Sequence, residues 1–134
     1  GYAITHGDIA RKLNIVRGPF NTTSIAQKAA LMALSDQDFI DDTVAKNNKV
    51  KTSFQQFLDE IGWPYYESHT NFILISTPIS GIEVFNYLLE RGYIIRPGDI
   101  LGYPNTIRVT IGTEEQMEEL QRLLKELDQV QKGK

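Results

Sequence analysis

The sequence predicts an α/β protein, an α+β sandwich in which a small mixed sheet carries helices on one face and a long helix connects it to the preceding residues. Three observations lead to this prediction. Residues 36–61 hold one long amphipathic stripe, and short apolar runs with strand character follow residue 62. Capping signals introduce two further amphipathic stretches among those runs. The resulting order β-β-α-β-β-α over residues 62–134 indicates helices packed on a sheet.

The first part of the chain predicts one short strand and two helices. Residues 1–4 (GYAI) have strand character, and residues 8–16 carry the i, i+4, i+7 stripe of a short amphipathic helix. Ser24 with Gln27 resembles a capping box, so we expect a second helix over residues 24–34. A strand at the first residue needs neighbours, so we expect this chain to be a piece of a longer protein.

The longest predicted helix covers residues 36–61, with Ser35 and Asp38 as its capping pair. At about 1.5 Å per residue it would span on the order of 40 Å, which is more than a small domain requires, so we expect it to bridge two domains. Gly62 and Pro64 end it. Its apolar residues hold mostly to one face: Phe39, Ile40, Val44, Val50, Phe54, Phe57, Leu58 and Ile61.

The remaining residues alternate between strands and helices. The predicted strands are 65–67, 71–77, 93–96 and 106–111. The predicted helices are 80–91 and 114–130, introduced by the capping pairs Ser80 with Glu83 and Thr113 with Gln116. These helices must cover the apolar face of the sheet.

Composition excludes several classes of function. The 134 residues are 41% hydrophobic and 23% charged, as in ordinary soluble globular proteins, and the net charge is −3. No basic cluster prepares the chain for nucleic acid or an anionic membrane surface. The absence of cysteine excludes disulfides, thiolate catalysis and cysteine-ligated metal. Because no apolar run could span a bilayer and no signal peptide is visible, we expect a cytoplasmic protein.

Two arginines stand in strand contexts where packing does not favour them. Arg96 ends an apolar run, and Arg108 alternates with Ile107, Val109 and Ile111, so it points to the face opposite theirs. Each guanidinium offers a planar fork of donors that fits a carboxylate or phosphate. Two forks at neighbouring strand ends would form an anion clamp. On composition alone, ordinary surface arginines on a solvated strand face are the competing interpretation.

No other residue pattern indicates chemistry. His6 and His69 have no metal-ligand spacing, and the serines lack a nucleophile-elbow context. The glycines show no phosphate-loop order, and no lysine stands in a setting that favours Schiff-base formation. The sequence therefore predicts a candidate anion site without a catalytic group or a metal ligand.

Five motifs occur in an order that resembles a known family. GYAI, VRGPFNTT, SHTNFILI, GYIIRPG and TIRVTIGT-EEQ are similar to the C-terminal part of histidinol-phosphate aminotransferases, which are fold-type I enzymes dependent on pyridoxal 5′-phosphate. The resemblance covers nearly all of the chain. It implies that residues 1–35 are the end of the large cofactor-binding domain, residues 36–61 the connecting helix, and residues 62–134 the small C-terminal domain.

The resemblance also implies roles. Arg108 would bind the anionic end of the substrate, and Arg96 would be its companion in holding the substrate phosphate. The Schiff-base lysine and the other residues that bind pyridoxal 5′-phosphate would precede Gly1, so this chain would hold no cofactor and would be inactive alone. The implied partners are histidinol phosphate, as the phosphate-bearing amino donor, and a 2-oxo acid. The parent would be a homodimer, with residues 17–23 near its interface.

Two alternatives remain open on the sequence. Threonine-phosphate decarboxylases and other amino-acid aminotransferases share much of this tail. From a different class, the β-α-β-β-α order of residues 71–130 would also suit a free-standing regulatory domain that binds amino acids or phosphates between subunits.

Overall fold

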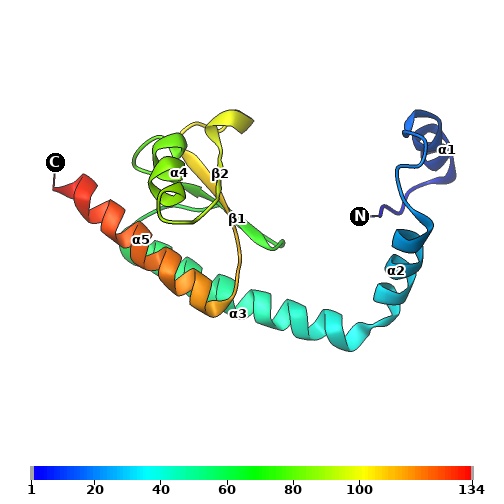
Figure 1. The fold of residues 1–134 in the computed structure, drawn as a ribbon, viewed down its shortest axis with the longest axis horizontal. Coiled ribbons are helices and arrows are strands. Elements are labelled where there is room, and N and C mark those ends of the chain that lie inside the picture. Colours follow the sequence, from blue (N-terminus) through cyan, green and yellow to red (C-terminus); the bar gives the residue numbers. More distant parts are fainter. Residues whose placement is uncertain (1, 134) are drawn as a thin grey trace. The chain divides into compact units, whose positions relative to one another are not determined.

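The computed structural model describes residues 2–133, which divide into two compact units, Gly1–Ile40 and Asp41–Lys134 (Figure 1). The first unit holds helices α1 (Gly7–Val16) and α2 (Ser24–Ser35). Helix α3 (Gln37–Ile61) begins in the first unit and continues into the second. The second unit adds a sheet, two further α-helices and a short 3-10 helix, η1 (Asp99–Leu101). Over the described residues, no helix combines the length and apolar character needed to cross a bilayer.

Helices α1 and α2 form where they were predicted, but neither contains a buried residue. The predicted strand over residues 1–4 is wrong as far as the described residues reach: residues 2–4 are irregular, and residue 1 lies outside them. A strand persists by pairing its backbone groups, and no described segment pairs with this one. The cap of α2 is Thr23, not Ser24, because the Thr23 hydroxyl accepts the Ala26 N–H (3.1 Å).

The long helix α3 confirms the prediction within one residue. Its first turn is capped by Asp36, whose carboxylate accepts the Phe39 N–H (3.2 Å), and not by Ser35. Gly62 ends the helix with a left-handed backbone (φ 76°), and the Trp63 N–H bonds the Leu58 carbonyl (2.9 Å). Only the later part of its apolar stripe is buried: Val50, Phe54, Phe57 and Leu58.

The sheet has the order β1-β3-β2, formed by β1 (Phe72–Ser76), β3 (Thr106–Thr110) and β2 (Arg96–Pro97). A mixed sheet was predicted, but both pairings are antiparallel. Strands β1 and β2 do run in the same direction, because each is antiparallel to β3. They are never hydrogen-bonded to each other, because β3 lies between them.

Two predicted strands are shorter than expected. Residues 65–67 contribute a single bridge, Tyr65 with Ile75. Of residues 93–96, only Arg96 enters the sheet, where it is followed by Pro97. The Tyr93 N–H is occupied by the end of the preceding helix, where it bonds the Leu88 carbonyl (2.9 Å). A segment that closes a helix cannot also pair as a strand at the same residue.

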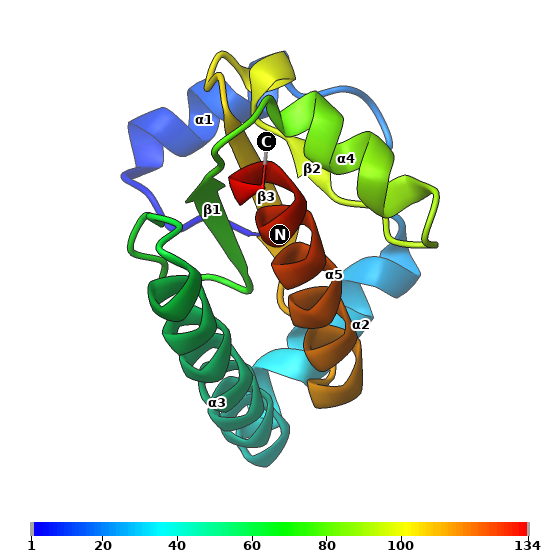
Figure 2. The ribbon, with the colours of Figure 1, turned by 90° about the vertical axis from the view of Figure 1, so that its left-hand side faces the viewer.

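One face of the sheet carries the core. Ile73, Ile75, Ile107 and Val109 are buried there against α3, α4 (Gly81–Leu89) and α5 (Glu114–Lys132), and α4 and α5 lie in front of the strands in Figure 2. The helices contribute Val50, Phe54, Phe57, Leu58, Val84, Leu88, Met117, Leu120, Leu123, Leu124 and Leu127. The predicted α/β class, with helices over one sheet face, is therefore confirmed.

A buried hydrogen bond links the segment that follows α3 to the C-terminal part of α5. The Trp63 indole N–H donates to the Asp128 carboxylate (3.0 Å), and both side chains are buried. Lys132 pairs with the other oxygen of that carboxylate (2.7 Å). Because a buried carboxylate is costly without partners, these two contacts fix α5 beside the end of α3.

Candidate anion-binding site

The two predicted arginines are paired across neighbouring strands. Arg96 on β2 stands directly opposite Arg108 on β3. Directly paired residues of an antiparallel ladder project to the same face, so both side chains leave the sheet on the face opposite the core. Leu74 on β1 is the other direct neighbour of Arg108. The central strand thus places Arg108 between an aliphatic residue and a second arginine.

Both arginines line one open pocket of about 200 Å³, together with Ile94, Ile95 and Thr110. Arg96 is exposed, whereas Arg108 is half-buried. The pocket therefore offers two cationic groups at different depths in a partly apolar setting. Its location is the uncovered sheet face that the alternation of Arg108 with Ile107 and Val109 predicted.

Neither guanidinium has an acidic partner among residues 2–133. The described ion pairs and side-chain hydrogen bonds include neither Arg96 nor Arg108, although three other arginines are paired with acids: Arg11, Arg91 and Arg122. Like charges directly opposite each other in a sheet destabilise it. The N–H donors of both guanidinium groups are therefore available. An anion bound between the two groups would remove the repulsion between their charges.

The loop that follows Arg96 is fixed by close backbone contacts. The Gly98 N–H bonds the Thr106 carbonyl (2.7 Å), and the Thr106 hydroxyl donates to the Tyr103 carbonyl (2.7 Å). Gly81, at the start of α4, lies so close to the Thr106 carbonyl that a β-carbon there would overlap it. The ends of β2 and β3 are therefore held together and against α4.

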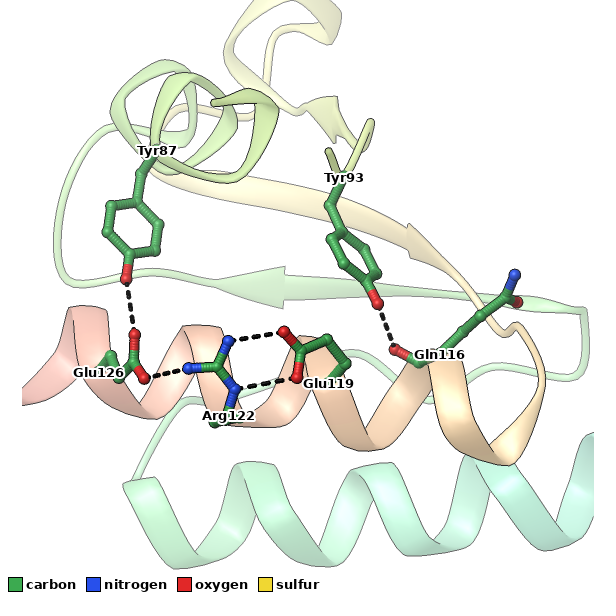
Figure 3. A network of polar contacts seen from close by, with 6 residues as sticks. All are labelled: Tyr87, Tyr93, Gln116, Glu119, Arg122 and Glu126. Atoms are coloured by element: carbon green, nitrogen blue, oxygen red, sulfur yellow. Dashed lines mark hydrogen bonds and ion pairs between the residues drawn. The ribbon is translucent and has the colours of Figure 1, made fainter. Parts of the chain in front are cut away.

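The segment that leads into Arg96 is fastened to α5. The Tyr93 hydroxyl donates to the Gln116 carbonyl (3.2 Å), while Tyr87 of α4 reaches Glu126 of α5 (3.5 Å), as Figure 3 shows. Between these two contacts, the Arg122 guanidinium binds Glu119 through two nitrogens (2.9 and 2.6 Å) and also contacts Glu126.

This network shifts the pKa of one carboxylate. The hydrogen bond from Arg122, together with its charge, lowers the pKa of Glu119 below the ordinary 4.5, against a smaller opposing effect of desolvation. The carboxylates of Glu119 and Glu126 raise the pKa of Arg122. Glu119 is therefore held ionised beside a cation that is already paired, so this arginine does not compete for the anion of the candidate site.

Other polar residues considered in the sequence do not join the site. The His6 imidazole accepts the Asp8 N–H and caps α1, whereas His69 is exposed and lies 3.5 Å from a carboxylate oxygen of Glu67. The described residues contain no group of three or more side chains that could hold a metal ion.

Sequence reasoning missed Phe72 as part of this face. The Arg108 Cζ lies over the Phe72 ring, 4.9 Å from its centroid. The contact depends on the pairing register of β1 with β3, which places Phe72 opposite Thr110, two residues from Arg108. The sequence holds one signal for this contact. The alternation within residues 71–77 puts Phe72 on the face opposite Ile73 and Ile75, which is the face of Arg108.

The chain is similar to known proteins over nearly its whole length. The sequence profile of the family described as aminotransferase class I and II matches residues 1–124. A protein named histidinol-phosphate aminotransferase 2 from Oceanobacillus iheyensis is 55% identical over 128 residues, which cover 96% of this chain and 35% of that protein. Histidinol-phosphate aminotransferase from a Geobacillus species is 47% identical over 134 residues, covering 100% of this chain and 36% of the relative.

Solved structures share the fold. The crystal structure of histidinol-phosphate aminotransferase from Clostridium acetobutylicum superposes with a TM-score of 0.78 at 27% identity, covering 91% of this chain and 38% of that one. The enzyme from Sinorhizobium meliloti, solved in complex with pyridoxal-5′-phosphate, gives 0.73 at 21% identity, covering 92% and 35%. This second likeness concerns the fold alone. The chain thus spans little more than a third of the length of the relatives it matches.

Proposed function

We propose that this chain, which belongs to the aminotransferase class I and II family, supplies the substrate-binding arginines of a histidinol-phosphate aminotransferase. One observation carries the proposal: Arg96 and Arg108 are paired across β2 and β3, line one pocket, and have no acidic partner among the described residues. The similarity to proteins named histidinol-phosphate aminotransferase supports the choice of a phosphate-bearing substrate.

The proposed task of the pair is binding and orientation. A phosphate carries more than one negative charge, and its oxygens can accept hydrogen bonds from two guanidinium forks at once. Binding it would remove the repulsion between Arg96 and Arg108. Holding the far end of the substrate in this way fixes where its amino-bearing carbon lies, and such positioning lowers the barrier of a group transfer.

Among the described residues, the pocket fits the substrate anion and not the ring of the cofactor. No lysine lines it, and its apolar residues are the aliphatic Ile94 and Ile95, so neither Schiff-base formation nor aromatic stacking is available there. In the full-length enzyme, pyridoxal 5′-phosphate would supply the electron sink for amino transfer, bound by residues outside this chain. We propose that the chain alone binds no cofactor and has no transaminase activity.

Family membership also supports a proposal for the domain organisation and assembly of the full-length enzyme. We propose that residues 1–35 end the large domain, residues 36–61 connect it, and residues 62–134 form the small domain. The full-length enzyme would be a cytoplasmic homodimer that transfers an amino group between histidinol phosphate and 2-oxoglutarate, with residues 17–23 near the subunit interface.

The test is kinetic and uses the full-length enzyme. Replacing one arginine that binds a buried anion costs on the order of 2–5 kcal/mol, so Arg108→Ala should raise the KM for histidinol phosphate by about 30-fold or more. Arg96→Ala should act in the same direction. The absorbance of the cofactor's internal Schiff base should be unchanged in both variants.

A matched control removes the same charge elsewhere. Arg91 lies in the turn that follows α4, where it contacts Tyr87 and Glu90, outside the pocket. Arg91→Ala should leave the KM unchanged. Loss of cofactor absorbance in Arg108→Ala together with the rise in KM would mean that Arg108 is structural. An unchanged KM would refute the proposal.

A further inference from the structure

The Arg108 side chain lies against the aromatic ring of Phe72, which can orient it. The guanidinium carbon lies over that ring, 4.9 Å from its centroid. The two residues come from paired strands: Phe72 is opposite Thr110, so it is the diagonal neighbour of Arg108 on the open face of the sheet. Diagonal neighbours are within reach of each other when one is aromatic and the other long.

This contact differs chemically from the way Arg122 is held, although Arg91 also lies over an aromatic ring, that of Tyr87. Arg122 is fixed by two carboxylates, which occupy its N–H donors. The ring of Phe72 attracts the cation through its negative π face and requires no hydrogen bond. It therefore restrains Arg108 while leaving the guanidinium donors and the positive charge available.

We infer that Phe72 is a positioning residue for anion binding, whose ring holds the Arg108 guanidinium toward the pocket. The inference rests on the proposed function and adds to it a residue that does not itself line the pocket. An unrestrained arginine loses substantial side-chain freedom when it binds an anion, and a guanidinium already held over a ring loses less. The effect of the ring should therefore appear in affinity for the anionic end of the substrate.

Leu74 provides a matched comparison. It lies on the same strand and the same face, directly opposite Arg108 in the ladder, and it is partly buried as Phe72 is. Its aliphatic side chain can pack against the arginine stem but has no π face. If the role of Phe72 were only to cover apolar surface, equivalent changes at Leu74 would have equivalent effects.

The experiment uses the full-length enzyme with two ringless variants, Phe72→Leu and Phe72→Met, the aromatic variant Phe72→Tyr, and the control Leu74→Met. The measured quantities are kcat and KM for histidinol phosphate, kcat/KM for histidinol, which lacks the phosphate, and the thermal midpoint. The ringless variants should raise the KM for histidinol phosphate about fivefold. Their kcat should stay within about twofold, with kcat/KM for histidinol unchanged, because the lost contact concerns only the anionic end. Phe72→Tyr keeps an aromatic ring, so its KM should equal that of the native enzyme. Leu74→Met should also leave the KM unchanged.

Two results would overturn the inference: an unchanged KM in both ringless variants, or equal losses for histidinol phosphate and histidinol. The thermal midpoint identifies a variant that does not fold. If one ringless variant fails to fold, the KM of the other ringless variant tests the role of Phe72. Arg108→Ala, measured in parallel, separates this inference from the proposed function. If Arg108→Ala raises the KM and the ringless variants do not, only the role of Phe72 fails; if Arg108→Ala has no effect, the proposed function fails as well.

Discussion

At the scale of single residues, the pair Arg96 and Arg108 is an arrangement that stability alone does not favour. Two cations face each other across a ladder without a described carboxylate between them. Arg11, Arg91 and Arg122 are paired with acids, whereas Arg17 donates to the side-chain oxygen of Asn21. Residues that break a local rule without structural compensation are expected at functional sites. The pair therefore indicates anion binding more strongly than either arginine does alone.

The first prediction concerns the stability of this pair. Because like charges directly opposite in a sheet destabilise it, Arg96→Gln should raise the free energy of unfolding by a few tenths to about 1 kcal/mol in phosphate-free buffer of low ionic strength. Added inorganic phosphate should stabilise the native chain and have little effect on the variant. Urea denaturation followed by circular dichroism measures both. A loss of stability in Arg96→Gln without phosphate would contradict the proposed repulsion.

The second prediction concerns Glu119. Its pKa in the folded chain is lowered below 4.5 by the hydrogen bond from Arg122. A carboxylate with a depressed pKa adds stability above its unfolded pKa, and this contribution is lost as the pH falls through its folded pKa. In a carbon-13 NMR titration of the side-chain carboxyl, Glu119 should titrate below the ordinary value. Arg122→Gln should return it toward 4.5, and an unchanged midpoint would refute the assigned cause.

At the scale of elements, the site depends on how closely α4 approaches the end of β3. Gly81 begins α4 with its α-carbon against the Thr106 carbonyl and the Asp99 carboxylate. Thr106 also accepts the Gly98 N–H that closes the ladder beyond Arg96. The absence of a side chain at Gly81 thus allows the helix to pack against the loop that follows the arginine.

The third prediction tests this approach. Gly81→Ala would place a methyl group against a backbone carbonyl that cannot move independently, so it should lower the free energy of unfolding by about 1–3 kcal/mol. Gly7→Ala is the matched control, because a β-carbon there meets nothing within 4 Å. Helix propensity then makes that control neutral or slightly stabilising. Equal denaturation midpoints for the two variants would contradict the packing account.

The elements could be predicted from the sequence where local chemistry decides them. Thr113 and Gln116 form both halves of the predicted capping box, and Gly62 ends α3 as predicted, with a left-handed backbone. Predictions failed where a contact distant in sequence decides. Residues 2–4 form no strand because no described segment pairs with them. The strand expected over residues 93–96 was too long for a local reason, because the Tyr93 N–H bonds the Leu88 carbonyl at the end of α4. The register that brings Phe72 near Arg108 could likewise not be predicted, because it depends on how β1 pairs with β3.

At the scale of the whole molecule, the two units differ in how they bury apolar residues. Residues 41–134 enclose a core around the sheet, whereas α1 and α2 contain no buried residue. Their exposed apolar side chains include Ile9, Leu13, Ile25, Leu31 and Met32. Apolar surface of this kind is typical of segments that pack against a partner surface.

The fourth prediction follows from this difference. The 134-residue chain in isolation should self-associate through α1 and α2, whereas a variant with Ile25, Leu31 and Met32 replaced by serine should associate less. Sedimentation velocity measures the change. Neither protein should develop a visible cofactor band with pyridoxal 5′-phosphate or show transaminase activity. A monomeric native chain would refute the predicted association, and a cofactor band would refute the proposed division of the active site.

A crystal structure of the full-length enzyme with histidinol phosphate bound would test directly whether Arg96 and Arg108 together hold the substrate phosphate. Phosphate oxygens should lie about 2.7–2.9 Å from nitrogens of both guanidinium groups. A phosphate bound elsewhere, with both arginines still free of it, would contradict the account.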